Sequence, residues 1–465
     1  MPEALLKVQD LAIELQDGSL LLEGAQLELH AGERLTIVCE SGAGKSILAQ
    51  AIMGTLPAAL RARGQITIAG HATDGERSKT QALWGKAITM LPQEPWTALS
   101  PLMRMHAQVS EAAHYAQGLS WGEAQSNAMQ RMAQLGIGHA AQQWLHQISG
   151  GMAQRVGVAA SGMTGARIVL ADEPTKGLDP SARDSVAQLL LELQSAGQAL
   201  LTITHDLALA RLLGGKVLVM QAGRVVESGP AEDVFARPQH VYTQALLAAQ
   251  PANWASLVKP LESDRQSLVI QAHQLSKSYG DRHLFQNIDL SLQRGETLSV
   301  SGASGCGKTT LGNILLGLVK ADAGHVEKAL LPRHKFQKLY QDPPAAFVPQ
   351  RKLRDALQDL SALHRLNMPR SEPLMQELGL KSELLDRLPS EVSGGELQRI
   401  ALLRLMLLEP AFIFADEPTS RLDVITQHET MKLLMKTAAS HQCAVLLVSH
   451  DAELAKACSH RHLAL

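Results

Sequence analysis

Two glycine-rich segments have the residue types and spacing of loops that grip phosphate groups. They occupy residues 39–46 and 302–309, and each ends in Gly-Lys followed by Ser or Thr. Between a strand and a helix, such a loop turns successive backbone N–H groups toward a phosphate, and the helix N-terminus adds its positive end. The residues expected to bind nucleotide here are Cys39, Glu40, Ser41, Gly42, Ala43, Gly44, Lys45 and Ser46, and Gly302, Ala303, Ser304, Gly305, Cys306, Gly307, Lys308 and Thr309.

An Asp-Glu pair follows each loop at the end of an apolar stretch. An isolated pair of this kind is usually only solvated, but behind a phosphate loop and before Pro-Thr it indicates hydrolysis. The first acid and the loop hydroxyl can hold Mg²⁺, and the second acid can orient and deprotonate the attacking water. The expected Mg²⁺ ligands are Ser46, Thr309, Asp172 and Asp416, and the expected bases are Glu173 and Glu417.

The first loop departs from the pattern because Cys39 stands where Gly is usual. A side chain at the loop entrance can strain or narrow the turn. We therefore predict weaker ATP binding at the first site than at the second, although a small Cys could also fit without effect.

The motifs recur in the same order, so the chain contains a repeat of domain size. Apolar stretches at 34–38, 168–171 and 199–204 in the first copy match 297–301, 412–415 and 444–449 in the second. Apolar runs that alternate with helices predict an α/β fold with parallel strands. Residues 64–70 predict a further strand, which the second copy shortens around residues 324–326.

The order of phosphate loop, Gln, Ser-Gly-Gly, Asp-Glu-Pro-Thr, Leu-Asp and His resembles that of the ABC ATPases, twice and over nearly the whole chain. The resemblance implies an intramolecular pseudo-dimer in which each ATP lies between one domain's phosphate loop and the other's Ser-Gly-Gly segment. Loop 39–46 would face residues 392–399, and loop 302–309 would face residues 148–155. The γ-phosphate would then meet Ser149, Gly150 and Gly151, or Ser393, Gly394 and Gly395.

The same resemblance implies roles for further residues. Gln93 and Gln341 resemble the residue that senses Mg²⁺ and water, and His205 and His450 resemble the switch histidine at the γ-phosphate. Asp179 and Asp423 match a Leu-Asp loop at the seam between domains. Tyr279 matches an aromatic that stacks on adenine, where the first copy has Leu15.

The predicted fold is therefore α/β, with two tandem P-loop NTPase domains of the ABC ATPase type. Each would combine a parallel core sheet, an antiparallel β subdomain and a helical subdomain. We assign residues 1–250 to the first domain, with a C-terminal extension at about 230–250. Residues 251–268 are the predicted linker, and 269–465 form an abridged second domain.

Residues 94–101, 223–230 and 237–247 resemble ATPase subunits of dipeptide, oligopeptide and nickel importers. The resemblance implies an ATP- and Mg²⁺-dependent motor at the cytoplasmic face of the membrane. Its partners would be two integral-membrane permeases and an extracytoplasmic binding protein, and its cargo peptides, nickel or metal chelates. A fused sugar-import ATPase, or a soluble tandem ABC protein acting on ribosomes or DNA, remains open.

Composition agrees with this location and these partners. The 43 basic and 45 acidic residues give a net charge of −2, so no nucleic-acid partner is expected. Residues 1–10 carry charges and no apolar core of signal-peptide length, and no stretch reaches the roughly 18 uninterrupted apolar residues of a membrane span, so neither is expected. The four cysteines are scattered, which favours reduced thiols over disulfides or a metal site.

Overall fold

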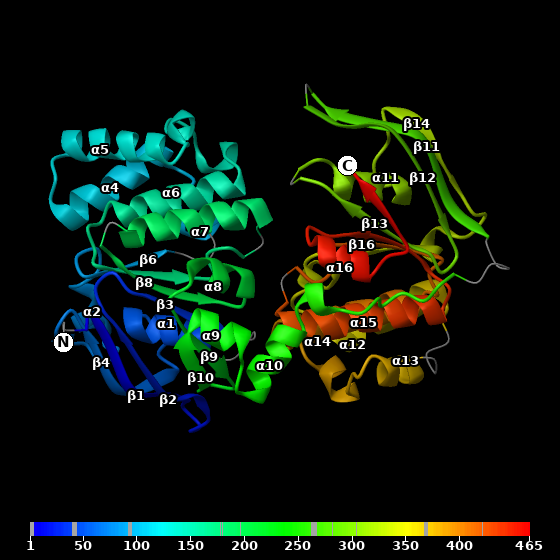
Figure 1. Ribbon diagram of the computed structural model, residues 1–465. Coiled ribbons are helices and arrows are strands. Elements are labelled where there is room, and N and C mark those ends of the chain that lie inside the picture. Colours follow the sequence, from blue (N-terminus) through cyan, green and yellow to red (C-terminus); the bar gives the residue numbers. More distant parts are fainter. Residues whose placement is uncertain are drawn as a thin grey trace. The chain divides into compact units, whose positions relative to one another are not determined.

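The computed structural model describes residues 4–39, 44–91, 95–176, 178, 180–195, 197–261, 267–280, 282–303, 305–366, 371–420 and 422–465. The chain divides into two compact units, Met1–Leu247 and Ala248–Leu465. They are called unit 1 and unit 2 below, and both are drawn in Figure 1.

Unit 1 is built on a mixed six-stranded core sheet. Its strands are parallel except for the last pair at one edge, and they occur in the order β10 (Arg224–Pro230), β9 (Lys216–Gln221), β3 (Arg34–Cys39), β8 (Ala199–Thr204), β7 (Ile168–Asp172) and β6 (Ile88–Leu91). The middle strands β3, β7 and β8 are buried almost throughout, as strands covered on both faces must be.

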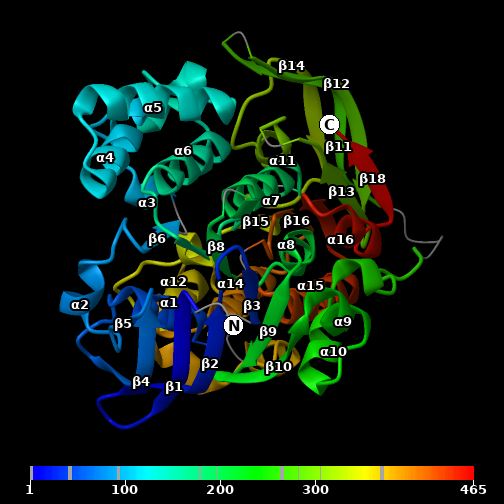
Figure 2. The same cartoon turned by 60° about the vertical axis from the view of Figure 1, so that its left-hand side comes forward.

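A second, antiparallel sheet of unit 1 has the order β2 (Leu20–Leu29), β1 (Leu6–Leu15), β4 (Leu60–Ile68) and β5 (His71–Ala72). Helix α1 (Lys45–Met53) follows β3, and α2 (Arg77–Gln81) and α3 (Pro95–Ala98) flank β6. Figures 1 and 2 both show α4 (Met105–Gln117), α5 (Trp121–Gln134) and α6 (Gly150–Gly162) side by side as a helical layer. The remaining helices are α7 (Pro180–Ser195), α8 (Leu207–Leu213), α9 (Ala231–Ala236) and α10 (Val241–Ala248).

Unit 2 repeats this plan in a shorter form. Its core sheet is parallel throughout, in the order β15 (Phe336–Leu339), β16 (Phe412–Asp416), β17 (Ala444–Val448), β13 (Thr297–Ser301) and β18 (Arg461–Ala464). Its antiparallel sheet has the order β12 (Arg282–Gln293), β11 (Leu268–Tyr279) and β14 (Ala323–Lys328). Its helices are α11 (Lys308–Leu316), α12 (Leu353–His364), α13 (Ser371–Glu377), α14 (Gly394–Met406), α15 (Val424–Ser440) and α16 (Ala452–Ala457).

The predicted α/β class and the parallel core strands are confirmed in both units. The six apolar stretches singled out in the sequence become β3, β7, β8, β13, β16 and β17. The stretch at 64–70 falls largely within β4, and its shortened counterpart is β14. Within the described residues, the antiparallel sheet of unit 2 therefore has three strands where that of unit 1 has four.

Part of the segment predicted to be a linker packs onto unit 2. Trp254 stacks on His428 with ring centroids 4.7 Å apart, and it lies with Leu257 against the apolar core of that unit. The Leu257 N–H donates to the Ala457 carbonyl at 2.7 Å. No helix in the described parts of the chain combines the length and apolarity needed to cross a membrane.

Candidate functional site

Both phosphate loops leave the carboxyl end of a central strand and enter a helix, as predicted. The first joins β3 to α1, and the second joins β13 to α11. Residues 40–43 and Ser304 lie outside the described residues. Gly44 and Gly307 cap the two helices with φ of 85° and 107°, in the left-handed region that favours glycine. At Gly44 an added Cβ would also lie 2.9 Å from the Leu21 carbonyl oxygen.

In unit 1, the structure brings the predicted phosphate-binding lysine, base and switch histidine together. Lys45 Nζ lies 2.6 Å from one carboxylate oxygen of Glu173, and His205 Nδ1 lies 2.8 Å from the other. Thr204 Oγ1 donates to the second oxygen at 3.3 Å. The Glu173 side chain is only 2 % exposed, so this carboxylate is almost wholly held by cationic and polar neighbours.

The surroundings of the two acids shift their pKa values in opposite directions. Burial opposes ionisation of Glu173, but the hydrogen bond and charge of His205 and the charge of Lys45 outweigh it and lower the pKa to about 2. Burial raises the pKa of Asp172, and the nearby charge of Glu173 adds to that rise. Of the two acids, Glu173 therefore ionises more readily.

The acids that end β7 and β16 fit the expected Mg²⁺ ligands. Asp172 and Asp416 are buried, and the loop hydroxyl of unit 2, Thr309 Oγ1, donates to Asp416 Oδ1 at 3.0 Å. In unit 1, the loop hydroxyl of Ser46 acts to lower the pKa of Asp172 against the effect of burial. Asp172 Oδ1 is buried without a hydrogen-bond partner among the described residues. A buried oxygen in this position suits a hard cation, which prefers oxygen ligands.

In unit 2, the predicted base is held by the histidine and the glutamine. His450 Nε2 lies 2.6 Å from Glu417 Oε1, and Gln341 Nε2 donates to Glu417 Oε2 at 3.0 Å. Lys308 does not bind this acid: its Nζ donates to the Gly302 and Ala303 carbonyls at 2.9 and 3.0 Å. The equivalent lysines of the two phosphate loops therefore bind different partners: an acid in unit 1 and the loop backbone in unit 2.

The Ser-Gly-Gly segments open helices α6 and α14. Ser149 and Ser393 are the N-caps, and their side chains accept from the Met152 and Glu396 N–H groups at 3.4 and 3.3 Å. In unit 2, Glu396 also accepts from the Ser393 N–H, which completes a capping box. Each segment thus offers the N-terminal end of a helix, where anions are favoured.

The helices opened by Ser-Gly-Gly, α6 and α14, are called the signature helices below. A buried glutamine in each of them binds the backbone just after the Asp-Glu pair. Gln154 Nε2 donates to the Pro174 carbonyl at 2.8 Å, and Gln398 Nε2 donates to the Pro418 carbonyl at 2.7 Å. In the sequence alone, these glutamines are part of a motif and have no evident task. Their repetition in both units indicates that they position the Asp-Glu segment against the signature helix.

Both predicted bases also have an unusual backbone. Glu173 and Glu417 have φ of 48° and 46°, a left-handed conformation that non-glycine residues adopt at a cost. Strain kept at the same position of two copies is typical of functional sites, where it aims a side chain. Sequence reasoning missed this feature because glutamate does not favour such a conformation.

The remaining predicted residues are more scattered. Asp423 is buried and caps α15, accepting from the Thr426 N–H at 3.0 Å. Tyr279 is 54 % exposed at the end of β11, and Leu15 is half-buried at the end of β1. Cys39 is buried at the end of β3, and none of the four cysteines, all within the described residues, forms a disulfide. Gln93 and Asp179 lie outside the described residues.

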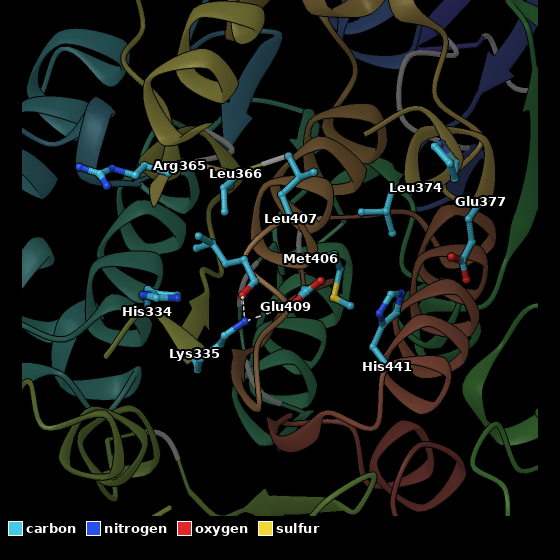
Figure 3. Close-up of a pocket in the computed structure, with 12 residues that line it drawn as sticks. His334, Lys335, Arg365, Leu366, Leu374, Glu377, Met406, Leu407, Glu409 and His441 are labelled. Carbon is cyan, nitrogen blue, oxygen red and sulfur yellow. Dashed lines mark hydrogen bonds and ion pairs between the residues drawn. The ribbon is translucent and has the colours of Figure 1, made fainter. Parts of the chain in front are cut away.

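Unit 2 also has a cavity of about 560 Å³ whose lining includes no residue of the phosphate loop. Figure 3 shows the side chains that line it. Its wall includes His334 and Lys335, just before β15, and Glu409, just before β16. These residues stand at the amino ends of parallel strands, whereas the loop follows the carboxyl end of β13. Ligands of such sheets bind at the carboxyl ends, so this cavity is not the nucleotide site.

Comparisons with known proteins agree with the geometry. The family model described as ABC transporter matches residues 22–176 and 285–420, one stretch in each unit. The "Peptidoglycan transport ATP-binding protein YejF" of Agrobacterium fabrum is 33 % identical over 98 % of this chain and 90 % of its own length. The "Glutathione import ATP-binding protein GsiA" of Salmonella typhi is 32 % identical over 95 % of this chain and 81 % of its own.

A solved structure also has the tandem fold. The archaeal ribosome recycling factor aABCE1, in complex with ribosomal stalk protein aP1, matches with a TM-score of 0.67 and 20 % identity, over 98 % of this chain and 87 % of its own. That likeness concerns the fold alone. Together with the family match in both units and the full-length relatives, the phosphate loop and the acid–histidine pair that occur in both units identify the chain as an ATPase of the ABC transporter family, with two such domains fused in tandem.

Proposed function

We propose that this chain is the motor subunit of an importer and couples ATP hydrolysis to uptake through separate membrane permeases. The observation that carries the proposal is the match, across at least 90 % of both lengths, to a relative named for peptidoglycan transport. The relatives named for glutathione import support the same class. On these grounds the cargo is a peptide or a peptide-containing molecule, such as a cell-wall fragment, rather than nickel or a metal chelate.

In this proposal each of the two nucleotide sites uses the same set of groups for hydrolysis. Lys45 and Lys308 leave their present partners and bind the ATP phosphates. Glu173 and Glu417 orient the attacking water and take its proton, and His205 and His450 hold those carboxylates in place. Ser46 and Asp172 in unit 1, and Thr309 and Asp416 in unit 2, would hold Mg²⁺, which would neutralise negative charge on the phosphates.

The motor also requires two halves that act together. We propose that each ATP is gripped by the phosphate loop of one unit and the Ser-Gly-Gly helix end of the other. ATP binding then closes the halves, the Gln93 and Gln341 segments pass that movement to the permeases, and hydrolysis reopens them. The chain would work at the cytoplasmic face of the membrane, with an extracytoplasmic binding protein delivering cargo.

A second candidate is a tandem ABC protein that acts on ribosomes, as the aABCE1 match suggests at the level of fold. The sequence of aABCE1 is 20 % identical to this chain, whereas that of the relative named for peptidoglycan transport is 33 % identical, which favours the importer. A fused sugar-import ATPase is a third candidate, which the relatives named for peptidoglycan transport and glutathione import do not favour.

Affinity purification of the tagged full chain from gently solubilised membranes tests the proposal. An importer motor is expected to bring two integral-membrane permeases with it, and the double variant E173Q/E417Q should retain them while losing ATP turnover. Recovery of ribosomes in place of membrane proteins would support the second candidate. Undiminished turnover in the double variant would contradict the assigned bases.

A further inference from the structure

Three metal-ligating side chains gather on the antiparallel sheet of unit 2, whereas the phosphate loop and the Asp-Glu pair follow strands of the core sheet. His273 lies on β11, and His325 and Glu327 lie on the neighbouring β14. One potential ligand atom from each lies within 4.8 Å of the others, and no other such group of three occurs within the described residues. In this sheet β11 lies between β12 and β14 (Figure 1).

Strand pairing explains why the three side chains meet. His273 and His325 are direct cross-strand partners, and Glu327 lies two residues further along β14. Residues two apart on a strand point to the same face, so all three project from one face. Ala272 and Val326, the adjacent pair, point to the other face, which packs on the apolar core of the unit.

The distances suit a divalent transition-metal ion. His325 Nε2 lies 3.4 Å from Glu327 Oε1, and the rings of His273 and His325 stack with centroids 5.0 Å apart. Zinc bound at about 2.0–2.1 Å in a tetrahedron needs donor atoms about 3.3 Å apart, so one pair already has that spacing. The side chains of His325 and Glu327 are 65 % and 61 % exposed, so small rotations can complete the set.

Unit 1 contains the same backbone frame without the ligands. There Gln9 on β1 pairs with Gln65 on β4, and Thr67 takes the place of Glu327. Both frames have a bulge residue with positive φ, Asp10 or Gln274, facing a glycine in the next strand. The cluster is therefore not needed to build this sheet, because Gln, Gln and Thr occupy the same positions in unit 1.

We propose that His273, His325 and Glu327 form a binding site for a divalent transition-metal ion of the zinc type. Imidazole nitrogens with one carboxylate oxygen are ligands that zinc accepts, and three protein ligands leave a coordination position open to water. A bound ion would link β11 to β14 and stabilise unit 2, because it binds the folded sheet and not the separated strands.

The test uses zinc chloride as the probe and the full-length chain. The matched variant is H273Q/H325Q/E327T, which writes the residues of unit 1 into the frame of unit 2. Calorimetric titration should show that the variant binds one zinc ion fewer per chain than the parent, or binds it at least about tenfold more weakly. Zinc should raise the thermal unfolding temperature of the parent and leave that of the variant unchanged.

A second variant, H334Q/H364Q, controls for loss of any histidine pair. These two rings lie 4.9 Å apart, but no third ligand joins them within the described residues, so zinc binding should equal that of the parent. The proposal is overturned if the parent binds no zinc, if the variant with the unit 1 residues binds it as the parent does, or if the control loses it equally.

Discussion

Glu173 holds two basic side chains at once, and this sets unit 1 apart from unit 2. Its two oxygens lie 2.6 Å from Lys45 and 2.8 Å from His205, and its side chain is almost completely buried. In unit 2, Glu417 keeps the histidine and a glutamine but not the lysine. ATP entering the first site must therefore compete with a carboxylate for Lys45, whereas at the second site it competes with backbone carbonyls for Lys308.

The Glu173 cluster predicts a pH-dependent part of the stability of unit 1. Its folded pKa of about 2 lies below the ordinary value of 4.5, so its stabilisation is fully present above pH 4.5 and is lost as pH falls toward 2. At about pH 7, Glu173→Gln should lower the free energy of unfolding by about 2–3 kcal/mol, and the difference should shrink in acid. Urea unfolding at several pH values measures this.

Glu23→Gln is the matched control for that experiment. It removes an ion pair with Arg224 whose side chains are 45 % and 64 % exposed, and exposed pairs contribute about 0–1 kcal/mol. The variant should unfold like the parent at every pH. A Glu173→Gln deficit that stays constant down to about pH 3 would contradict the assigned cause, because protonation of Glu173 would then remove no stabilisation.

Cys39 carries a second prediction at the scale of one residue. It continues β3 in register with Met220 of β9 and packs in the unit 1 core, whereas its counterpart Gly302 has φ of 152°. Cys39→Gly should therefore cost about 1–2 kcal/mol of unfolding free energy through lost packing and backbone freedom. If the side chain also narrows the loop, the variant should bind ATP more tightly, which nucleotide titration measures; unchanged affinity would contradict the effect predicted from sequence.

At the scale of elements, the helix after the phosphate loop packs on the strand that ends in the Asp-Glu pair in both units, but the sizes of the side chains in contact differ. In unit 2, a Cβ added to Gly312 of α11 would lie 2.2 Å from the Phe414 ring on β16. The corresponding residues of unit 1 are Ala49 on α1 and Leu170 on β7, both fully buried in one apolar cluster. Unit 2 thus combines a very small helix residue with a large strand residue, whereas the two side chains in unit 1 are closer in size.

This packing predicts a compensating pair of substitutions. Gly312→Ala alone should destabilise unit 2 by about 1–3 kcal/mol, because the core must move to admit the methyl group. Adding Phe414→Leu, which copies unit 1, should recover much of that loss. Chemical unfolding of the two single variants and the double variant gives the coupling energy. Additive effects would mean that the helix does not press on the ring.

The elements and the composition of the site could largely be predicted from sequence, but its contacts could not. Apolar runs ending at a glycine loop, an acid or a histidine predict parallel strands whose carboxyl ends share one edge, so Lys45, Glu173 and His205 were expected at the same edge of the core sheet. Which partner each lysine takes depends on side-chain rotation, which the shared motif does not encode. The left-handed glutamates and the Gly312–Phe414 match depend on pairs of residues far apart in the chain.

At the scale of the whole molecule, the proposed head-to-tail arrangement can be tested without separating the units. If each ATP joins one unit's lysine to the other unit's signature serine, Lys45→Ala with Ser393→Arg damages one composite site twice and leaves the other intact. Lys45→Ala with Ser149→Arg instead damages both sites once. The arginine blocks the helix end that would face the γ-phosphate, at a capping cost of about 1 kcal/mol per helix.

Steady-state ATPase assays then separate the two arrangements. The double variant K45A/S393R should retain measurable turnover and K45A/S149R should fall to background, although each loses one lysine and one N-cap serine. Equal stability of the two variants in thermal unfolding is the control, since Ser149 and Ser393 cap equivalent helices. The opposite ranking, with turnover surviving only in K45A/S149R, would mean that each unit hydrolyses ATP with its own signature helix, and the proposed coupling between halves would fail.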